Sequence, residues 1–503
     1  MPRLDTPTTI VVSLCFLVHL AYRYRQKRSK HLPPGPTRWP IVGNALIIPL
    51  HNQHQFYKEL GQQLDTKILY LEVPGQSILV INDINVAQDL LEKRSTIYSS
   101  RPDIPMLADV VGHRTFFAFM PYGNEWRAHR RLFTQYFSEK SLPQIQEKSL
   151  DVQATNSWIG ALSTSMTYGL PVQRQHDPLI HFAERALGGS AAAAAPGRFL
   201  VNVIPWLKYV PDWMPGAGFK RLGKEIMKEL VQLREEPYQA ALQMIDNGTA
   251  PPSFVSDTLE KIRDQPNFDP QDPYVKQTAE QVFGAASDTT RGAVSTFILA
   301  ILMHPEIQRK IQQELDSVIG PDRLPDYSDI PRLKYLAAAV KESLRWNPVL
   351  PTSVPHLVSE DDEYMGYFIP KGTVVMSNTY AMLHDEKVFP NPKEFDPGRF
   401  IKDGILRDDI IDPESIATFG FGRRICPGSH IALANLYIAA ASLLYLFDFL
   451  PPLDADGNLV EVTMNISSDS IGSEPEKFDC RIIPRKGKDA HGLLKDYMGT
   501  DPM

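Results

Sequence analysis

The feature that most constrains this chain is a single cysteine inside the glycine-rich segment Phe419-Gly-Phe-Gly-Arg-Arg-Ile-Cys426-Pro-Gly428, which directly precedes an apolar helical stretch. The other two cysteines, Cys15 and Cys480, are far away and no CxxC pair occurs. This excludes a disulfide framework and a zinc or iron–sulfur site built from several cysteines. A thiolate needs backbone N–H donors or a positive partner, and a glycine-rich turn leading into a helix supplies such donors. From the residues alone, Cys426 is either a small buried side chain or a thiolate ligand.

The composition is that of a folded globular protein, because 43% of the 503 residues are hydrophobic and 22% are charged. A chain of this length can enclose a large cofactor. Its formal net charge of −7 provides no basic field for a polyanion, so we expect no nucleic-acid partner.

The N-terminus carries an apolar run, IVVSLCFLVHLAY over residues 10–22, which is followed at once by the basic sequence RYRQKRSK. A membrane-spanning helix needs about 20 apolar residues, so this run predicts a short anchor. A cleaved signal peptide is the competing interpretation, but its basic residues would precede the apolar run. Because cytoplasmic flanks are rich in Lys and Arg, we predict an N-terminal membrane anchor and basic flank over 1–30, with the remainder in the cytosol.

The rest of the chain divides into a proline-rich hinge over 31–44 and a catalytic body over 45–503. In the body, two short β runs at 68–73 and 77–82 flank a Pro-Gly turn and predict a hairpin. Strands and helices do not alternate afterwards, so we predict a mainly α fold with small β-sheets. Amphipathic periodicity predicts helices at 125–140, 218–246, 273–303, 305–319, 333–346 and 429–447, and strand-like runs return near 352–376 and 459–483.

The cysteine segment matches F-x-x-G-x-R-x-C-x-G, the haem-thiolate signature of cytochrome P450 enzymes, at all five fixed positions: Phe419, Gly422, Arg424, Cys426 and Gly428. The resemblance implies the cytochrome P450 fold, with haem (heme b, iron protoporphyrin IX) buried between two long helices. It also implies that Cys426 is the axial thiolate ligand, that Arg424 binds a haem propionate and that Phe419 packs beside the sulfur. An axial thiolate donates electron density through the iron and favours O–O cleavage.

Two further segments resemble a structural network of the same family. Glu342 and Arg345, three residues apart on one helix face, resemble its E-x-x-R pair. Arg399, in Phe395-Asp-Pro-Gly-Arg-Phe, resembles the arginine that completes the network. Taken alone, an i,i+3 pair is usually a solvated surface pair. The resemblance implies instead that the network is buried and holds the thiolate loop in place.

The segment Gly284-Ala-Ala-Ser-Asp-Thr-Thr lies in a long apolar helical stretch and resembles the oxygen-activation motif of the family. The resemblance implies that Asp288 and Thr289 relay protons during oxygen activation. The competing interpretation is that such hydroxyls only bond back to the helix backbone. Ala286 stands where the family most often has glycine, and its methyl group lies near the expected oxygen site.

The haem carboxylates require cationic or N–H donors. Trp126 and Arg130, four residues apart on one helix face, resemble the family's W-x-x-x-R pair. His356 matches the position of a third donor, and Arg101 is a candidate for a fourth. An indole N–H and a bidentate guanidinium both suit a buried carboxylate. The competing interpretation of His356 is an exposed strand histidine.

The resemblance implies a monooxygenase of the microsomal fungal type, similar to O-methylsterigmatocystin oxidoreductase-like enzymes, in the endoplasmic reticulum membrane. No dinucleotide fingerprint opens a βα unit, so electrons from NADPH and flavins arrive through a partner, NADPH-cytochrome P450 reductase, with cytochrome b5 as a second donor. Basic residues on the expected proximal face, including Arg127, Arg131 and Arg423, are candidates for docking it, or are simply solvated. The alternatives are a haem-thiolate isomerase or dehydratase and a non-catalytic haem protein.

The variable segments of the family predict an apolar pocket for a lipophilic small-molecule substrate, whether terpenoid, steroid-like or aromatic. One region departs from the family, because 147–168 is too short for the two full helices expected there. A missing part of a helix would impair folding or haem retention. The expected pocket segments are 104–120, 203–216, the helix face around Phe283 and Ser287, 349–354 and 467–471.

Overall fold

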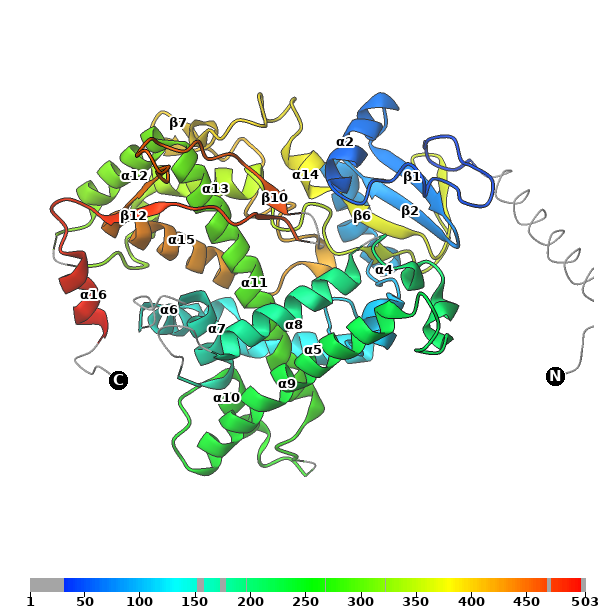
Figure 1. Ribbon diagram of the computed structural model, residues 1–503, viewed down its shortest axis with the longest axis horizontal. Coiled ribbons are helices and arrows are strands. Elements are labelled where there is room, and N and C mark those ends of the chain that lie inside the picture. Colours follow the sequence, from blue (N-terminus) through cyan, green and yellow to red (C-terminus); the bar gives the residue numbers. More distant parts are fainter. Residues whose placement is uncertain are drawn as a thin grey trace, which may run out of the picture.

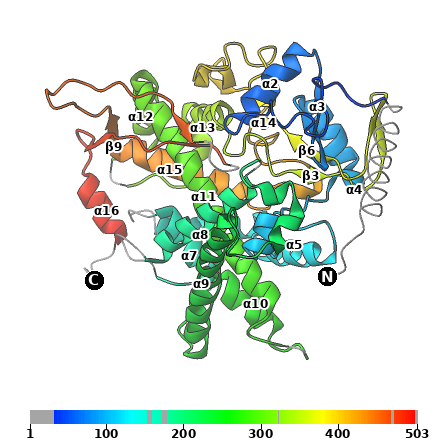
Figure 2. The ribbon, with the colours of Figure 1, turned by 45° about the vertical axis from the view of Figure 1, so that its right-hand side comes forward.

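The computed structural model describes residues 31–151, 158–171, 178–195, 197–266, 268–321, 323–467 and 472–498. A small β-rich part lies at one side and helices form the rest, with the 31-residue helix α11 (Pro273–Met303) running through the middle (Figure 1). The turned view also places α11 at the centre (Figure 2). The predicted mainly α fold with small sheets is confirmed. The predicted anchor over 1–30 lies outside the described residues.

The largest sheet has four strands in the order β1-β2-β6-β3. The predicted hairpin is confirmed, since β1 (Ile68–Val73) pairs antiparallel with β2 (Gln76–Ile81). β2 then pairs in parallel with β6 (Val374–Ser377), and β3 (His356–Leu357) pairs antiparallel with β6. The C-terminal half of the chain thereby brings His356 to the sheet that the N-terminal hairpin begins.

The proline-rich segment lies against this sheet. The amide of Tyr70 donates a hydrogen bond to the Pro34 carbonyl over 2.8 Å. A Cβ atom on Gly35 would lie 2.0 Å from the Tyr70 carbonyl oxygen, an approach that requires glycine. The described part of the predicted hinge is therefore fixed to β1 at this point.

Each of the six helices that the apolar periodicity predicts is present, with ends that differ by a few residues. The predicted helix at 125–140 ends at Tyr136 because Phe137 leaves the helical conformation, with ψ 54°. The other helices are α2 (Gln53–Gln63), α3 (Ile84–Ala87), α4 (Ser95–Tyr98), α5 (Asn124–Tyr136), α6 (Leu142–Asp151), α7 (Trp158–Tyr168), α8 (Pro178–Ala194), α9 (Gly218–Asp246), α10 (Phe254–Ile262), α12 (Pro305–Val318), α13 (Lys334–Trp346), α14 (Thr379–Leu383), α15 (Ser429–Leu446) and α16 (Ala490–Met498).

Short strand pairs connect the helical parts. The strands β4, β5, β10, β11 and β12 fall mainly within the two regions with strand-like sequence, whereas β7, β8 and β9 lie outside them. The register places Glu474 of β11 opposite Ser467 of β10. The pairs are β4 (Asp362–Tyr364) with β5 (Tyr367–Ile369), β7 (Ile401–Lys402) with β8 (Ile405–Leu406), β9 (Phe447–Leu450) with β12 (Arg481–Pro484), and β10 (Ile466–Ser467) with β11 (Glu474–Pro475).

The described residues of the region 147–168, predicted to be short for two helices, comprise the end of α6, a helix of ten residues that begins at Leu142, and all of α7, with 11 residues. α7 packs along α11, where the hydroxyl oxygens of Ser163 and Ser287 lie 2.7 Å apart. In the described part of this region, one short helix therefore ends and a second short helix follows.

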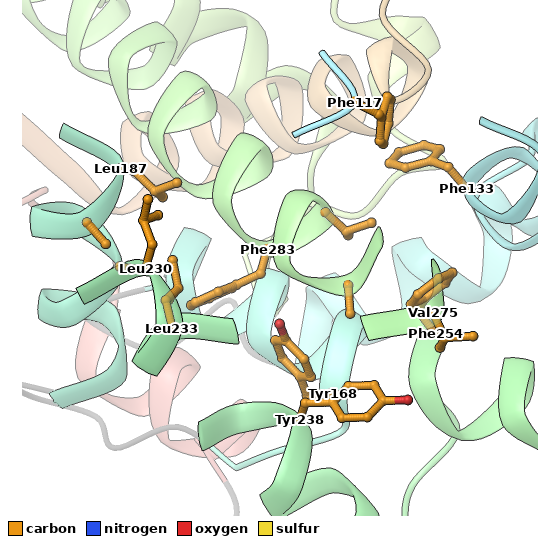
Figure 3. Close-up of a cluster of buried hydrophobic side chains, with 14 of the residues drawn as sticks. Phe117, Phe133, Tyr168, Leu187, Leu230, Leu233, Tyr238, Phe254, Val275 and Phe283 are labelled. Carbon is orange, nitrogen blue, oxygen red and sulfur yellow. The ribbon is translucent and has the colours of Figure 1, made fainter. Parts of the chain in front are cut away.

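Aromatic side chains from α5, α7, α9 and α10 form a core around the first half of α11 (Figure 3). Tyr168 meets Phe283 edge-on at 5.8 Å between ring centroids, and Phe137 stacks on Phe254 at 5.8 Å. A second core joins the other half of α11 to α12, α13 and α15. Among the described residues, α15 is the one helix long and apolar enough to cross a membrane, and 61% of it is buried inside the molecule. Here it acts as a core helix.

Candidate functional site

Cys426 lies in a tight loop between the 3₁₀ turn Gly422–Arg424 and helix α15. Its amide donates to the Phe419 carbonyl over 2.8 Å and so closes the loop on itself. Gly422 has φ 55°, and a Cβ atom there would lie 2.2 Å from the Leu91 carbonyl oxygen. The backbone therefore fixes the position of the cysteine, and glycine at 422 is required for both conformation and space.

The charge state of Cys426 depends on two neighbours. Burial raises the pKa of the Cys426 thiol, while the backbone N–H of Gly428 and the charge of Arg130 lower it. Arg130 on α5 is also bound to the loop, because its Nη1 donates to the Ile425 carbonyl over 2.8 Å. Burial lowers the pKa of the Arg130 guanidinium, and Cys426 opposes that shift. Arg130 therefore both fixes the loop and favours the thiolate.

Arg424 is buried beside this loop with three carbonyl partners. Its Nε donates to Ser99 over 2.8 Å and its Nη2 donates to Met120 over 2.7 Å. Its Nη1 lies 3.4 Å from the Phe117 carbonyl. The guanidinium carbon lies 4.4 Å from the ring centroid of Trp126, a cation–π contact. Burial, followed by repulsion from another arginine, lowers the pKa of Arg424 to about 9.

Arg101 and His356 lie next to Arg424. Arg101 Nη1 donates to the Val354 carbonyl over 2.6 Å, and His356 Nδ1 lies 2.7 Å from the Tyr98 carbonyl oxygen. Burial, and then the charge of Arg424, holds the pKa of Arg101 well below its usual range. Burial, and then the charge of Arg101, does the same to the pKa of His356. His356 is 5% exposed, so its interpretation as an exposed strand histidine is wrong.

The site thus gathers two buried arginines, a partly buried arginine and a buried histidine, with repulsion among their charges: Arg101, Arg424, Arg130 and His356. In the described part of the chain, none of the four forms an ion pair with a carboxylate; their bonds go to carbonyl oxygens. Buried positive charge is costly without a counter-charge. A dianionic ligand such as haem, with two propionates, supplies that counter-charge, so the residues present fit the expected cofactor.

Helix α11 contributes the other polar groups. Ala285 and Thr289, one turn apart, are exposed in the middle of a helix that is otherwise largely buried. The Thr289 hydroxyl donates to the Ala285 carbonyl over 2.7 Å, as the backbone-bonding interpretation predicts. A hydroxyl oxygen that donates in this way can still accept hydrogen bonds. Asp288 is half-exposed, and its Oδ1 accepts from Arg291 over 2.8 Å.

The expected pocket face of α11 needs a correction. Phe283 is fully buried against Tyr168 in the core (Figure 3), and Ser287 bonds to Ser163 of α7. Successive helical residues are 100° apart, so Phe283 points roughly opposite to Ala285. The accessible side of the helix is that of Ala285 and Thr289.

The predicted Glu/Arg network is confirmed. Glu342 and Arg345 on α13 are fully buried and joined by two hydrogen bonds of 2.7 and 2.8 Å. Arg399 Nε lies 3.2 Å from Glu342 Oε1, and the amide of Asp396 donates to the same oxygen over 2.9 Å. The interpretation as a solvated surface pair is therefore wrong.

Sequence reasoning missed two polar contacts of α11. Gln281 Nε2 donates to the Thr115 carbonyl over 3.0 Å and so binds the expected substrate segment to the helix. Arg291 contacts Glu474 of β11 as well as Asp288. The i,i+3 spacing from Asp288 to Arg291 was a sequence signal for the contact between these two residues.

Comparison with known proteins gives the class. The sequence matches the family model described as "Cytochrome P450" over residues 33–155 and 176–472. The unmatched stretch 156–175 overlaps the region predicted to be shortened. "Cytochrome P450 monooxygenase ple1" from Rhodocybe pseudopiperita is 39% identical over 96% of both chains. "Cytochrome P450 monooxygenase 98" from Postia placenta is 40% identical over 95% of this chain and 94% of its own.

A third relative, "Tryptamine 4-monooxygenase" from Psilocybe cyanescens, is 35% identical over 98% of this chain and 99% of its own. The chain therefore belongs to the cytochrome P450 family and is a monooxygenase of the type found in fungi. Membership implies a haem-thiolate iron centre.

Proposed function

We propose that this monooxygenase inserts one oxygen atom of O2 into lipophilic small molecules, with electrons from NADPH delivered by a partner reductase. When bound, the haem supplies the oxidising chemistry. Cys426 would supply the thiolate ligand of its iron, and Trp126, Arg130, Arg424 and His356 would hold its carboxylates. The observation that carries this proposal is the uncompensated positive charge of the buried arginines beside the cysteine loop.

The chain's own residues then divide the remaining tasks. Arg130 keeps the loop in position through the Ile425 carbonyl. Asp288 is half-exposed, so its carboxylate can exchange protons with solvent, and the exposed Thr289 hydroxyl can accept and pass on a proton at Oγ1. In this proposal the Ala285–Thr289 face of α11 and the loop before α15 would provide the protein groups on either side of the cofactor.

The substrate is proposed to be terpenoid, steroid-like or aromatic. The described parts of the expected substrate segments carry apolar and aromatic side chains, including Ile104, Phe119 and Val349. Such a lining binds by apolar area and shape. The Psilocybe cyanescens relative carries the name of an enzyme acting on tryptamine, an aromatic compound, which supports an aromatic substrate here.

The electron donor is proposed to be NADPH-cytochrome P450 reductase, with cytochrome b5 as a second donor. Arg127 and Arg131 are exposed on one face of α5, and Arg423 is exposed beside the cysteine loop. Positive charge at this place suits an acidic flavoprotein surface. Reduction by the reductase should therefore slow as ionic strength rises.

The location is proposed to be the endoplasmic reticulum membrane, held by the N-terminal anchor with the catalytic domain in the cytosol. Trp206, Tyr209 and Trp213 are 64–79% exposed, an unusual state for large aromatic side chains on one short segment. Aromatic side chains of this kind favour the membrane interface.

The carbon monoxide difference spectrum of the reduced protein tests the thiolate ligation. We expect the red-shifted Soret band that thiolate ligation produces, and its loss in Cys426→Ser. An unchanged band in Cys426→Ser would remove Cys426 from the centre. Substrate-dependent NADPH consumption with the reductase distinguishes the monooxygenase from a haem-thiolate isomerase or dehydratase, which turns over without NADPH, and from a non-catalytic haem protein.

A further inference from the structure

Arg291 on α11 lies between two carboxylates from different parts of the chain. Its Nη2 is 2.8 Å from Oδ1 of Asp288, one turn earlier on the same helix. The same nitrogen is 3.3 Å from Oε2 of Glu474 on β11. All three side chains are between 43% and 45% exposed. One guanidinium is thus shared by the proposed proton-relay acid and by a strand residue 186 positions away in the chain, counted from Asp288 to Glu474.

The strand that carries Glu474 is itself fixed to α11 by a second, buried contact. Ser473 Oγ donates to Asn347 Oδ1 over 2.7 Å, and Asn347 Nδ2 donates to Thr296 Oγ1 of α11 over 3.1 Å. The Ser473 amide also donates to the Val349 carbonyl over 2.8 Å. These bonds fix the backbone at residue 473 relative to α11, and they thereby hold the neighbouring Glu474 close to Arg291.

The same strand pair includes a residue expected to meet substrate. Ser467, the first residue of an expected pocket segment, is the register partner of Glu474. A displacement of Ser467 therefore displaces Glu474 and changes the balance between the two carboxylates that share Arg291. An exposed i,i+3 ion pair contributes little to stability, so any role of this contact has to be sought in geometry.

We propose that Arg291 is a positioning residue of the monooxygenase reaction. Its guanidinium orients the Asp288 carboxylate, and through Glu474 it makes that orientation depend on the β10–β11 strand pair. The proposal rests on the proposed function, because it needs Asp288 to deliver protons. Asp288 is the group that carries the proton, and Arg291 acts through it.

The test uses the full-length protein loaded with haem, in membranes with its reductase and without substrate. Reduction of O2 then has two outcomes: O2 + NADPH + H⁺ gives H2O2 + NADP⁺, and O2 + 2 NADPH + 2 H⁺ gives 2 H2O + 2 NADP⁺. Water requires delivery of more protons to each O2 than peroxide does. The hydrogen peroxide released per NADPH consumed, which runs from one to zero, therefore reports proton delivery.

The variants are Arg291→Gln, Arg291→Lys, Glu474→Gln, Asp288→Asn and the double variant Arg291→Gln with Asp288→Asn. Arg185→Gln removes an exposed arginine of α8 that is paired with Glu229 of α9, and is the matched control. A second measurement, amide hydrogen exchange of residues 472–476, follows the strand itself and does not depend on turnover.

We expect Asp288→Asn and Arg291→Gln each to raise the peroxide ratio, by roughly threefold or up to its limit of one, and Arg291→Lys to restore most of the original value. The double variant should be no worse than Asp288→Asn, because both changes act on one group. Arg291→Gln and Glu474→Gln should speed exchange at 472–476, whereas Arg185→Gln should change neither measurement.

The outcomes that overturn the proposal differ from those that overturn the proposed function. If Asp288→Asn leaves the peroxide ratio unchanged, the relay role of Asp288 fails and the positioning role fails with it. If Asp288→Asn raises the ratio but Arg291→Gln does not, or if lysine gives no rescue, only the positioning role fails. Unchanged exchange at 472–476 in both Arg291→Gln and Glu474→Gln overturns the dependence on the strand pair.

Discussion

Arg399 lies 3.2 Å from Glu342, measured from Nε to Oε1, although 57 positions separate the two residues in the chain. Glu342 is fully buried and also accepts two hydrogen bonds from Arg345. Arg345 and Arg399 in turn bond to the carbonyl of Glu394. Helix α13 and the segment after α14 are thus joined through one carboxylate.

Removing that carboxylate charge should strongly destabilise the protein. Glu342→Gln leaves Arg345 and Arg399 near each other without a counter-charge, which costs about 3–5 kcal/mol for a buried pair. The free energy of unfolding from denaturant titration checks this. Glu229→Gln, at an exposed ion pair, should change it by less than about 1 kcal/mol. A loss in Glu342→Gln as small as that of the control would show that the network adds no stability.

The steric requirement for glycine at position 422 can be tested by comparison with Gly404, which also has a positive φ but has free space around it. Gly422→Ala places a methyl group 2.2 Å from the Leu91 carbonyl oxygen. Gly404 also has positive φ, at 74°, but no heavy atom lies within 4 Å of a Cβ atom there. We expect a loss of about 2–5 kcal/mol for Gly422→Ala and about 1–2 kcal/mol for Gly404→Ala. Equal losses in thermal or denaturant unfolding would contradict the steric argument.

Arg130 is predicted to control cofactor retention. Arg130→Gln removes the charge beside Cys426 and the donor to the Ile425 carbonyl, so we expect a several-fold lower ratio of haem to protein after purification. Arg130→Lys keeps the charge without the planar fork and should be intermediate. Arg263→Gln, an exposed arginine after α10, should retain the original ratio. Pigment content equal to that of the unaltered protein in Arg130→Gln would exclude this role.

Acid should weaken the contact between α5 and α11 through His129. This side chain is fully buried, its Nδ1 lies 2.9 Å from Thr278 Oγ1, and burial lowers its pKa from 6.5 to about 4. The unfolded chain therefore binds the proton more readily, and stability is lost as the pH falls from 6.5 towards 4. At pH 5 the loss amounts to about 2 kcal/mol for this group. His129→Phe should reduce the difference in unfolding free energy between pH 7 and pH 5 by about that amount, and an unaltered difference would refute the assignment.

The exposed aromatic segment is predicted to touch lipid. In the full chain reconstituted in vesicles, brominated lipids should quench part of the tryptophan fluorescence, because bromine acts only on nearby rings. Trp213, which is 79% exposed, should supply much of the quenched component, so Trp213→Phe should reduce it. Trp346 is 5% exposed, and Trp346→Phe should leave the quenched component in place. Equal quenching in Trp213→Phe and the unaltered protein would argue against contact with lipid.

The helices and the first hairpin could be predicted from the sequence because their signals are local. Apolar residues at helical spacing define α9, α11 and α12, and the turn at Pro74–Gly75 defines the hairpin. The resemblance in short motifs also predicted the interaction between Glu342 and Arg399. The local sequence pattern alone would have placed these residues on the surface.

The contacts between distant segments could not be predicted in this way. The π-helical turn Met106–Val110 has no periodic signal, and the carbonyl partners of Arg424 come from segments whose position depends on the whole fold. The error at Phe283 has a related cause. Periodicity identifies an apolar helix face but does not say whether protein or ligand covers it.

The hydrogen bond from Arg424 to the Ser99 carbonyl joins residues 325 positions apart. During synthesis, the segments that contain Ser99 and Met120 emerge long before their partner is made, because the chain leaves the ribosome from its N-terminal end. Closure of the basic cluster is therefore a late, non-local step of folding, of the kind that high contact order makes slow. Under the proposed function, cofactor capture would have to wait until the loop around Cys426 has been made, and nascent chains that stop before Arg424 would be colourless.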